Sequence, residues 1–297
     1  MLKLAEYALR SPLQTALLMA ATLLMYMGLV ILLPLLWISI ASIALVAMRK
    51  GFKATLLPMF YALLMIFLLS YLLIPGAATA MVVIAIGIWL PSLVVSLVLR
   101  HTVSISMALQ ANVYLALAAL VVIEGSFSKD IIETMLMQQE ALSTLASSLT
   151  AEQMNLYIQM LPGVITVAFL FNSFVSVLLA RWWQSRLFNA GGFKAEYLAL
   201  RLDQRFAWLS VILVGATFFA EKSAAGILIV LISVYAFQGV AIAHNIVSQR
   251  SLHVSWLVVF YVLLLFIPQT IIFVAMVAFV DTWADFRSLS KQPSSHE

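Results

Sequence analysis

The sequence predicts an all-helical bundle that crosses a membrane many times, and three observations indicate it. Of the 297 residues, 64% are hydrophobic and only 9% are charged, whereas soluble domains are about 25% charged. The mean hydropathy is +1.10. The apolar runs are continuous rather than alternating, and they reach the ~20 residues that a helix needs to cross the hydrocarbon core. Helices and closed β-barrels both satisfy their backbone groups inside the bilayer. Barrel strands alternate apolar and polar residues, however, so continuous apolar runs favour helices.

About nine apolar segments are predicted to cross the membrane, or eight if one of them is divided differently. They lie at 13–30, 32–48, 54–74, 78–99, 104–124, 163–183, 206–220, 224–247 and 255–280. An amphipathic stretch at 2–9 precedes them and is predicted to lie on the membrane surface. The apolar run 17–48 lacks a small-residue cleavage site, so we expect it to be retained as two spans that turn near Pro34.

Two amphipathic segments interrupt the apolar pattern. Segment 125–162 repeats apolar residues at seven-residue spacing and is predicted to form two extracytoplasmic amphipathic helices. The second of these opens with a capping box from Thr150 to Gln153 and ends before a span that starts at 163. Segment 184–205 is predicted to be a cytoplasmic amphipathic connector. Apart from these insertions, we expect 1–297 to form a single integral membrane domain.

The basic residues predict the orientation. With the N-terminus in the cytoplasm, 12 of the 16 Lys and Arg fall on the cytoplasmic side, as the positive-inside rule requires. The formal charge of +4 is therefore a topology signal, and no nucleic-acid partner is expected. Nine spans would place the C-terminus outside, and eight would place it inside.

Several kinds of chemistry have no sequence signature here. The chain has no cysteine, so a disulfide, a thiolate nucleophile and a cysteine metal site are excluded. There is no phosphate-binding Gly-rich loop and no His-Glu-x-x-His motif, and the four histidines lack metal-type spacing. The carboxylates Glu124, Glu221 and Asp281 fall at predicted span ends rather than at mid-depth, which argues against a proton-coupled transporter. We expect no enzyme activity, no metal and no cofactor.

Uncharged polar residues inside the apolar spans are the candidate ligand contacts. Gln238 and Asn245 are seven residues apart, so they share one helix face, and His244 lies about 100° away. Other predicted spans add polar residues of the same kind, namely Gln110, Asn112, Asn172 and Ser176. They could line a small-molecule pocket, or they could hydrogen-bond neighbouring helices and hold the bundle together.

A basic amphipathic stretch at 193–205 is the candidate contact surface. Lys194, Arg201 and Arg205 lie along it, with apolar residues at helical spacing. These bases could rest on anionic lipid headgroups. Alternatively, they could dock a cytoplasmic or membrane partner.

Three stretches together resemble a known family. They are "GGFKAEYLALRL", "FQGVAIAHNI" and "WLVVFYVLLLFIPQ" leading to "DTWADFR". They resemble the YybS-like family of uncharacterised bacterial multi-pass membrane proteins, chiefly over 181–287, which implies a protein of the bacterial inner membrane. That family is distantly similar to the S components of energy-coupling-factor transporters, which meet their coupling partner through an Ala-x-x-x-Ala helix. Ala16 and Ala20 fit that pattern here.

These observations favour a small-solute-binding, transport-type component that lacks its own ATPase. The alternatives are a membrane scaffold or assembly protein and, after it, a lipid-handling protein. The expected partners are the lipid bilayer, a small-molecule ligand, and a membrane or cytoplasmic protein.

Overall fold

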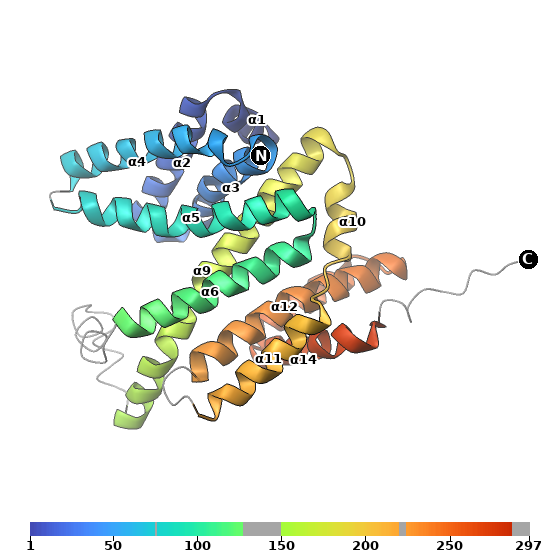
Figure 1. Ribbon diagram of the computed structural model, residues 1–297. Helices are drawn as coiled ribbons and strands as arrows, with labels where there is room; N and C mark the ends of the chain where they lie inside the picture. Colours follow the sequence, from blue (N-terminus) through green and yellow to red (C-terminus); the bar gives the residue numbers. More distant parts are fainter. Residues whose placement is uncertain (75, 127–149, 220–223, 287–297) are drawn as a thin grey trace, which may run out of the picture. The chain divides into compact units, whose positions relative to one another are not determined.

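The computed structural model describes residues 1–74, 76–126, 150–219 and 224–286, which form helices joined by short links, with no strand among them (Figure 1). The helices are α1 (Leu2–Arg10), α2 (Pro12–Gly28), the 3-10 turn η1 (Val30–Leu32), α3 (Leu33–Lys50), α4 (Lys53–Leu73), α5 (Ala78–Thr102), α6 (Ile105–Ser126), α9 (Ala151–Phe188), α10 (Gly192–Leu198), α11 (Gln204–Thr217), α12 (Ala224–Gln249), α13 (Ser255–Phe266) and α14 (Gln269–Ala284). The predicted all-helical class is confirmed. Most of the predicted insertion at 125–162 lies outside the described residues.

Helix length separates full spans from shorter elements. Six described helices are long and apolar enough to cross a membrane, namely α3, α4, α5, α6, α9 and α12, and the bent pair α13–α14 makes a seventh if it counts as one span. By contrast, α2 has 17 residues and α11 has 14. At 1.5 Å per residue these helices are about 26 and 21 Å long, less than the ~30 Å hydrocarbon core. The described spans therefore number six or seven rather than about nine.

Helix α9 corrects one predicted boundary. The predicted capping box is confirmed, because Gln153 Oε1 accepts from the Thr150 amide (2.9 Å) and Thr150 Oγ1 accepts from the Gln153 amide (3.2 Å). The helix then runs for 38 residues straight through Pro162, whereas a break was predicted there. A proline is tolerated inside an apolar helix when neighbouring groups take up the carbonyl that it leaves free.

The predicted span 255–280 contains a break that was not expected. It is divided into α13 and α14, whose axes differ by 119°. Ile267 has φ −125° and ψ 86°, outside the helical region, because the ring of Pro268 disfavours a helical residue before it. The amphipathic stretch 193–205 is also only partly helical, since α10 ends at Leu198 and α11 begins at Gln204. The residues between them, 199–203, form a non-helical connector.

The described chain is composed of two compact units. Unit 1 comprises Met1–Asn112 and Phe169–Tyr197, and unit 2 comprises Val113–Ala168 and Leu198–Glu297. The prediction of one membrane domain with two insertions stays a prediction.

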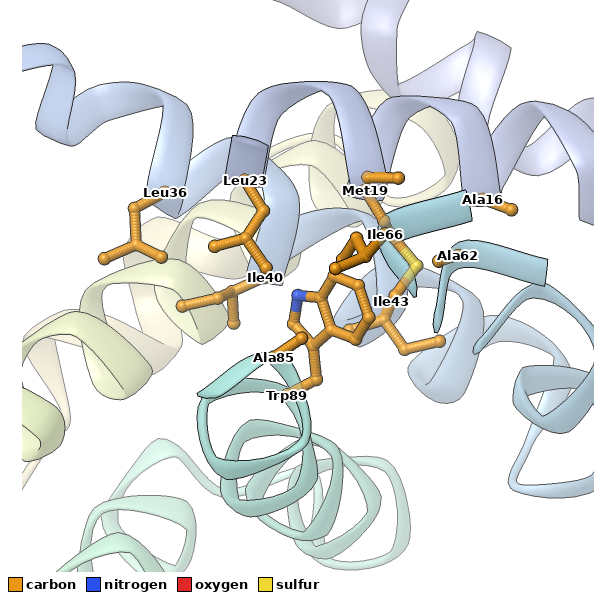
Figure 2. Close-up of a cluster of buried hydrophobic side chains, with 11 residues drawn as sticks. Ala16, Met19, Leu23, Leu36, Ile40, Ile43, Ala62, Ile66, Ala85 and Trp89 are labelled. Carbon is orange, nitrogen blue, oxygen red and sulfur yellow. The ribbon is translucent and has the colours of Figure 1, made fainter. Parts of the chain in front are cut away.

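The core of unit 1 is built by α2, α3, α4 and α5 around Trp89 (Figure 2). The Trp89 indole is fully buried, and its Nε1 donates to Ser39 Oγ (3.1 Å). Ser39 Oγ in turn donates to the Met19 carbonyl (2.8 Å). A polar relay therefore connects α5, α3 and α2 inside an otherwise apolar cluster.

The two ends of unit 1 differ in charge. Residues 11–48 and 54–99 contain no Asp, Glu, Lys or Arg, so the tips of the α2–α3 and α4–α5 hairpins are uncharged. Basic residues lie instead where α3 and α5 end. Ile31, at one uncharged tip, is 88% exposed. An apolar side chain so exposed is consistent with a lipid environment.

Unit 2 depends on glycines where helices approach one another. A Cβ added at Gly163 of α9 would lie 2.6 Å from the Gly226 Cα of α12, so these two helices meet backbone to backbone. A Cβ at Gly239 of α12 would collide with Val274 of α14, 2.8 Å from its carbonyl oxygen. Small residues that permit close backbone approach are the usual basis of helix packing in membranes.

Replacing Gly239 by alanine tests this packing. We expect Gly239→Ala to lower the free energy of unfolding by about 1–3 kcal/mol, because Val274 lies in the space of the new methyl group. The matched control is Gly87→Ala in α5, where nothing lies within 4 Å of the new atom. Unfolding in mixed detergent micelles would measure both. Equal stability of the two variants would contradict the packing.

Candidate functional site

The polar face of α12 binds the non-helical connector 199–203. Gln238 Oε1 accepts from the Leu202 amide (2.9 Å), and Asn245 Nδ2 donates to the Leu198 carbonyl (3.2 Å). Two helical turns separate the two amides, so from one face they reach Leu202 in the connector and Leu198, the last residue of α10, as the spacing predicted. Backbone groups outside a helix need such partners when water is absent.

Gln238 also contacts α14. Its Nε2 donates to the Ala278 carbonyl (2.8 Å) and to Asp281 Oδ2 (3.3 Å). The side chain is 0% exposed, and both hydrogens of its NH2 group, together with its oxygen, have protein partners. Gln238 therefore joins the connector, α12 and α14, which supports the structural interpretation of this residue over ligand contact.

Asp281 lies where a carboxylate was not expected. It is 0% exposed, and its Oδ1 accepts from the Phe286 amide (2.9 Å) just after α14 ends. Gln238, its other partner, is the fifteenth of the 26 residues in α12. Asp281 therefore lies in the last turn of α14, and its contact with Gln238 also puts it beside the middle of α12, which was not expected.

Arg201 connects the connector to the end of α14. Its Nη2 donates to the Thr282 carbonyl (3.0 Å), and its Nη1 lies 3.2 Å from Asp285 Oδ2. A cation at a helix C-terminus is favourable because the last carbonyls carry partial negative charge. Both side chains are partly exposed, so the ion pair contributes less than about 1 kcal/mol.

The C-terminal part of the same face of α12 holds a side chain whose hydrogen-bonding groups are not all paired. Asn245 Oδ1 is buried and accepts no hydrogen bond within the described part of the chain. Its orientation is determined, because only the NH2 end of the amide can donate to the Leu198 carbonyl. Beside it, His244 Nε2 lies 2.7 Å from the Tyr261 hydroxyl of α13.

The remaining predicted ligand contacts belong to unit 1. Asn172 Oδ1 accepts from Trp37 Nε1 (2.8 Å), and Ser176 Oγ donates to the Asn172 carbonyl (2.6 Å). Asn112 Nδ2 donates to the Leu170 carbonyl (2.9 Å). Gln110 is buried in the same unit. The polar residues of α12 in unit 2 and those of unit 1 are therefore two separate candidate ligand sites.

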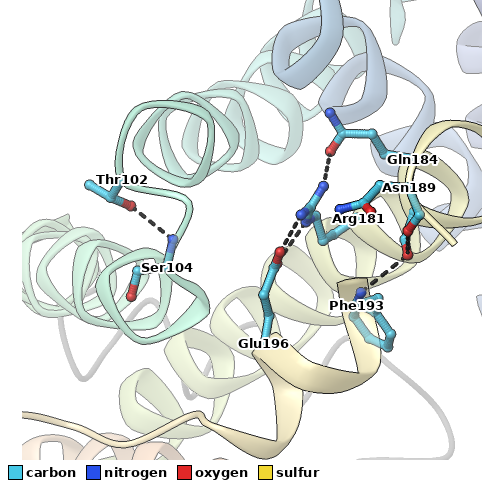
Figure 3. A network of polar contacts seen from close by, with 8 residues as sticks. Thr102, Ser104, Arg181, Gln184, Asn189, Phe193 and Glu196 are labelled. Atoms are coloured by element: carbon cyan, nitrogen blue, oxygen red, sulfur yellow. Dashed lines mark hydrogen bonds and ion pairs between the residues drawn. The ribbon is translucent and has the colours of Figure 1, made fainter. Parts of the chain in front are cut away.

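The α9–α10 elbow is fixed by an ion pair that the sequence analysis missed (Figure 3). Arg181 Nε donates to Glu196 Oε2 (2.8 Å), and its Nη2 contacts Glu196 Oε1. Arg181 Nη1 donates to Gln184 Oε1 (2.7 Å). The Phe193 amide, at the start of α10, donates to Ser185 Oγ (3.1 Å). The sequence does contain a signal for this ion pair, because Arg181 and Glu196 lie on either side of the helix-breaking pair Gly191-Gly192.

The predicted partner contacts have different surroundings. Lys194 and Arg205 are exposed, whereas Arg201 is engaged by α14. Ala16 and Ala20 are buried in the core of unit 1, so their face of α2 is occupied by helices of this chain. Partner and lipid contact at these positions stays a prediction.

The described residues include no group of three or more His, Asp or Glu side chains that could hold a metal ion. The chemistry that they offer is hydrogen bonding by amides and hydroxyls. Such groups can bind an uncharged polar solute.

Comparison with protein families decides the broad assignment. A family model with the description "Predicted membrane protein (DUF2232)" matches residues 123–282, more than half of the chain. The chain belongs to the DUF2232 family. The polar face of α12 lies inside the matched region. A search of curated proteins and a search of solved structures find no match. This DUF2232 protein is thus an integral, multi-pass membrane protein in contact with the lipid bilayer.

Removing the Gln238 amide tests the contact between α12, the connector and α14. We expect Gln238→Leu to destabilise the protein by at least about 2 kcal/mol, because each buried group that loses its partner costs about 1–3 kcal/mol. Ser233→Ala on the same helix is the control, since Ser233 Oγ donates to the carbonyl of Ile229 in its own helix. Detergent unfolding followed by tryptophan fluorescence would compare them. A Gln238→Leu variant as stable as Ser233→Ala would show that the amide contributes nothing.

Removing the Arg201 guanidinium tests the end of α14. We expect Arg201→Gln to change global stability by less than about 1 kcal/mol. It should nevertheless speed amide hydrogen exchange over 282–286 several-fold, because the last carbonyls and Asp285 lose their cation. Arg205→Gln, an exposed position in α11, should leave that exchange unchanged. Identical exchange in both variants would contradict the contact.

Proposed function

We propose that this chain is a small-solute-binding, transport-type component that lacks its own ATPase and is energised by separate subunits. The absence of a phosphate-binding loop in the sequence supports this proposal, as does the resemblance to YybS-like proteins and, distantly, to the S components of energy-coupling-factor transporters. The proposal includes a location in the bacterial inner membrane with the N-terminus in the cytoplasm, which the bias of Lys and Arg supports. It also includes the absence of enzyme activity.

The observation that carries the proposal is the buried Asn245 Oδ1. An acceptor that loses water without gaining a partner costs about 1–3 kcal/mol, so a donor from outside the chain would stabilise it. The neighbouring His244 and Tyr261 side chains add polar groups to the same part of α12. The solute that fits this chemistry is a small, largely uncharged molecule with an N–H or O–H donor.

A second candidate, a membrane scaffold, is favoured by the rigid α9–α10 elbow. The bidentate Arg181–Glu196 pair holds α10 against α9. On α10, Lys194 is exposed and the rings of Phe193 and Tyr197 stack 5.8 Å apart at 18°. A rigid surface with one cation and two aromatic rings suits a protein partner.

A ligand screen on the purified full-length chain tests the solute proposal. We expect at least one uncharged metabolite, vitamin or nucleobase to raise the unfolding temperature in detergent. For such a compound, Asn245→Ala should weaken binding about tenfold or more, and His244→Ala should weaken it less. Ser248→Ala, exposed on the same helix, should leave the affinity unchanged.

Two outcomes would oppose the solute proposal. One is the absence of any stabilising compound together with unchanged solute uptake in a strain that lacks the chain. The other is a compound whose affinity is the same for the parent chain, Asn245→Ala and His244→Ala. Purification of the chain with a stable, stoichiometric partner that Lys194→Glu abolishes would favour the scaffold.

A further inference from the structure

Five basic residues gather at one end of unit 1, and we call them the cationic collar: Arg10, Arg49, Lys50, Lys53 and Arg100. Contacts between helices bring them together. Lys50 Nζ donates to the Leu9 carbonyl at the end of α1 (2.8 Å), and Arg100 Nη1 donates to the Ala47 and Met48 carbonyls at the end of α3 (3.2 and 3.3 Å). Lys53 begins α4, two residues after Gly51, against which the Arg100 guanidinium lies.

The collar has little negative charge to balance it. Glu6 and Glu196 are the carboxylates in the two sequence ranges of unit 1, and Glu196 is bound to Arg181. Within the described part of the chain, no carboxylate lies within ion-pair distance of a collar residue. All five collar side chains are exposed. Helix C-termini offset part of the repulsion, but an unneutralised cluster of this kind attracts an anion.

An exposed apolar strip continues from the collar along α4. It comprises Leu56, Leu57, Phe60 and Leu64, which are 50%, 46%, 60% and 44% exposed. Their spacing from Lys53 places them on its face of the helix. Phe52, in the turn before α4, is also exposed. A cation at the head of an apolar strip matches a molecule with a phosphate at one end and a hydrocarbon chain at the other.

We propose that the cationic collar is a binding site for an anionic glycerophospholipid. The phosphate would lie among Arg10, Lys53 and the neighbouring guanidinium groups, and one acyl chain would follow the exposed face of α4. A free phosphate or nucleotide would use the cations but not the apolar strip. This site is in unit 1, so it is independent of the solute site proposed at Asn245.

The test compares lipids on the full-length chain in neutral detergent. Phosphatidylglycerol should be retained in native mass spectra and should raise the unfolding temperature, whereas phosphatidylcholine at the same concentration should not. The double variant Arg10→Gln/Lys53→Gln should weaken phosphatidylglycerol binding about fivefold for each charge removed. Within the described part of unit 1, both side chains are exposed and neither makes an ion pair, so the variant should remain folded. Leu57→Ser/Phe60→Ser should weaken lipid binding without changing the charge.

The control is Arg205→Gln/Arg250→Gln, which removes two exposed charges from unit 2 and should leave phosphatidylglycerol binding unchanged. Equal weakening by both double variants would overturn the proposal in favour of non-specific attraction. Equal stabilisation by inorganic phosphate would overturn it in favour of a soluble anion. Unchanged binding after Leu57→Ser/Phe60→Ser would overturn the role of the apolar strip.

Discussion

Peptide groups that belong to no helix need partners within the protein when they are buried away from water, and the connector 199–203, in which Leu200 and Leu202 are buried, shows how this requirement is met. Two amides on one face of α12 hold it: Gln238 binds the Leu202 amide, and Asn245 binds the carbonyl of Leu198, the residue just before the connector. The same Gln238 binds the Ala278 carbonyl and Asp281. One side chain thus joins α12 to both the connector and α14. The position of α11, which the connector leads into, follows from this arrangement.

The bend between α13 and α14 explains why a carboxylate can lie beside the middle of α12. A straight helix over 255–280 would carry Asp281 away from Gln238, to the end of a span. The non-helical Ile267 before Pro268 turns the chain by 119°, and Gly239 lets Val274 approach closely enough for Gln238 to reach α14. Three residues therefore act together: Pro268 breaks the helix, Gly239 permits close approach of the backbones, and Gln238 supplies the hydrogen bonds.

Much of this fold is predictable from hydropathy and local rules. The ends of α3, α4 and α5, the break near Pro34 and the capping box at Thr150 all follow from residues that act within one turn of the chain. The shared face of Gln238 and Asn245 follows from helical periodicity alone.

Helical periodicity does not predict which residue of another helix a given side chain contacts. Whether Pro162 breaks a helix depends on neighbouring helices that sequence does not place, and it does not break α9. The pairing of Arg181 with Glu196, or of Trp37 with Asn172, depends on a turn or on a contact 135 positions away. The contact of Asp281 with Gln238 was not foreseen for the same reason, because it depends on how α14 packs against α12.

The uncharged tips of the α2–α3 and α4–α5 hairpins have a consequence for biogenesis. A lysine or aspartate at the centre of a translocating helix costs about 2.5–3.5 kcal/mol, and residues 11–48 and 54–99 contain none of these side chains. The α4–α5 hairpin, whose two helices are both long enough to cross a membrane, can therefore partition from the insertion machinery as a pair, because no charged side chain lies at its tip.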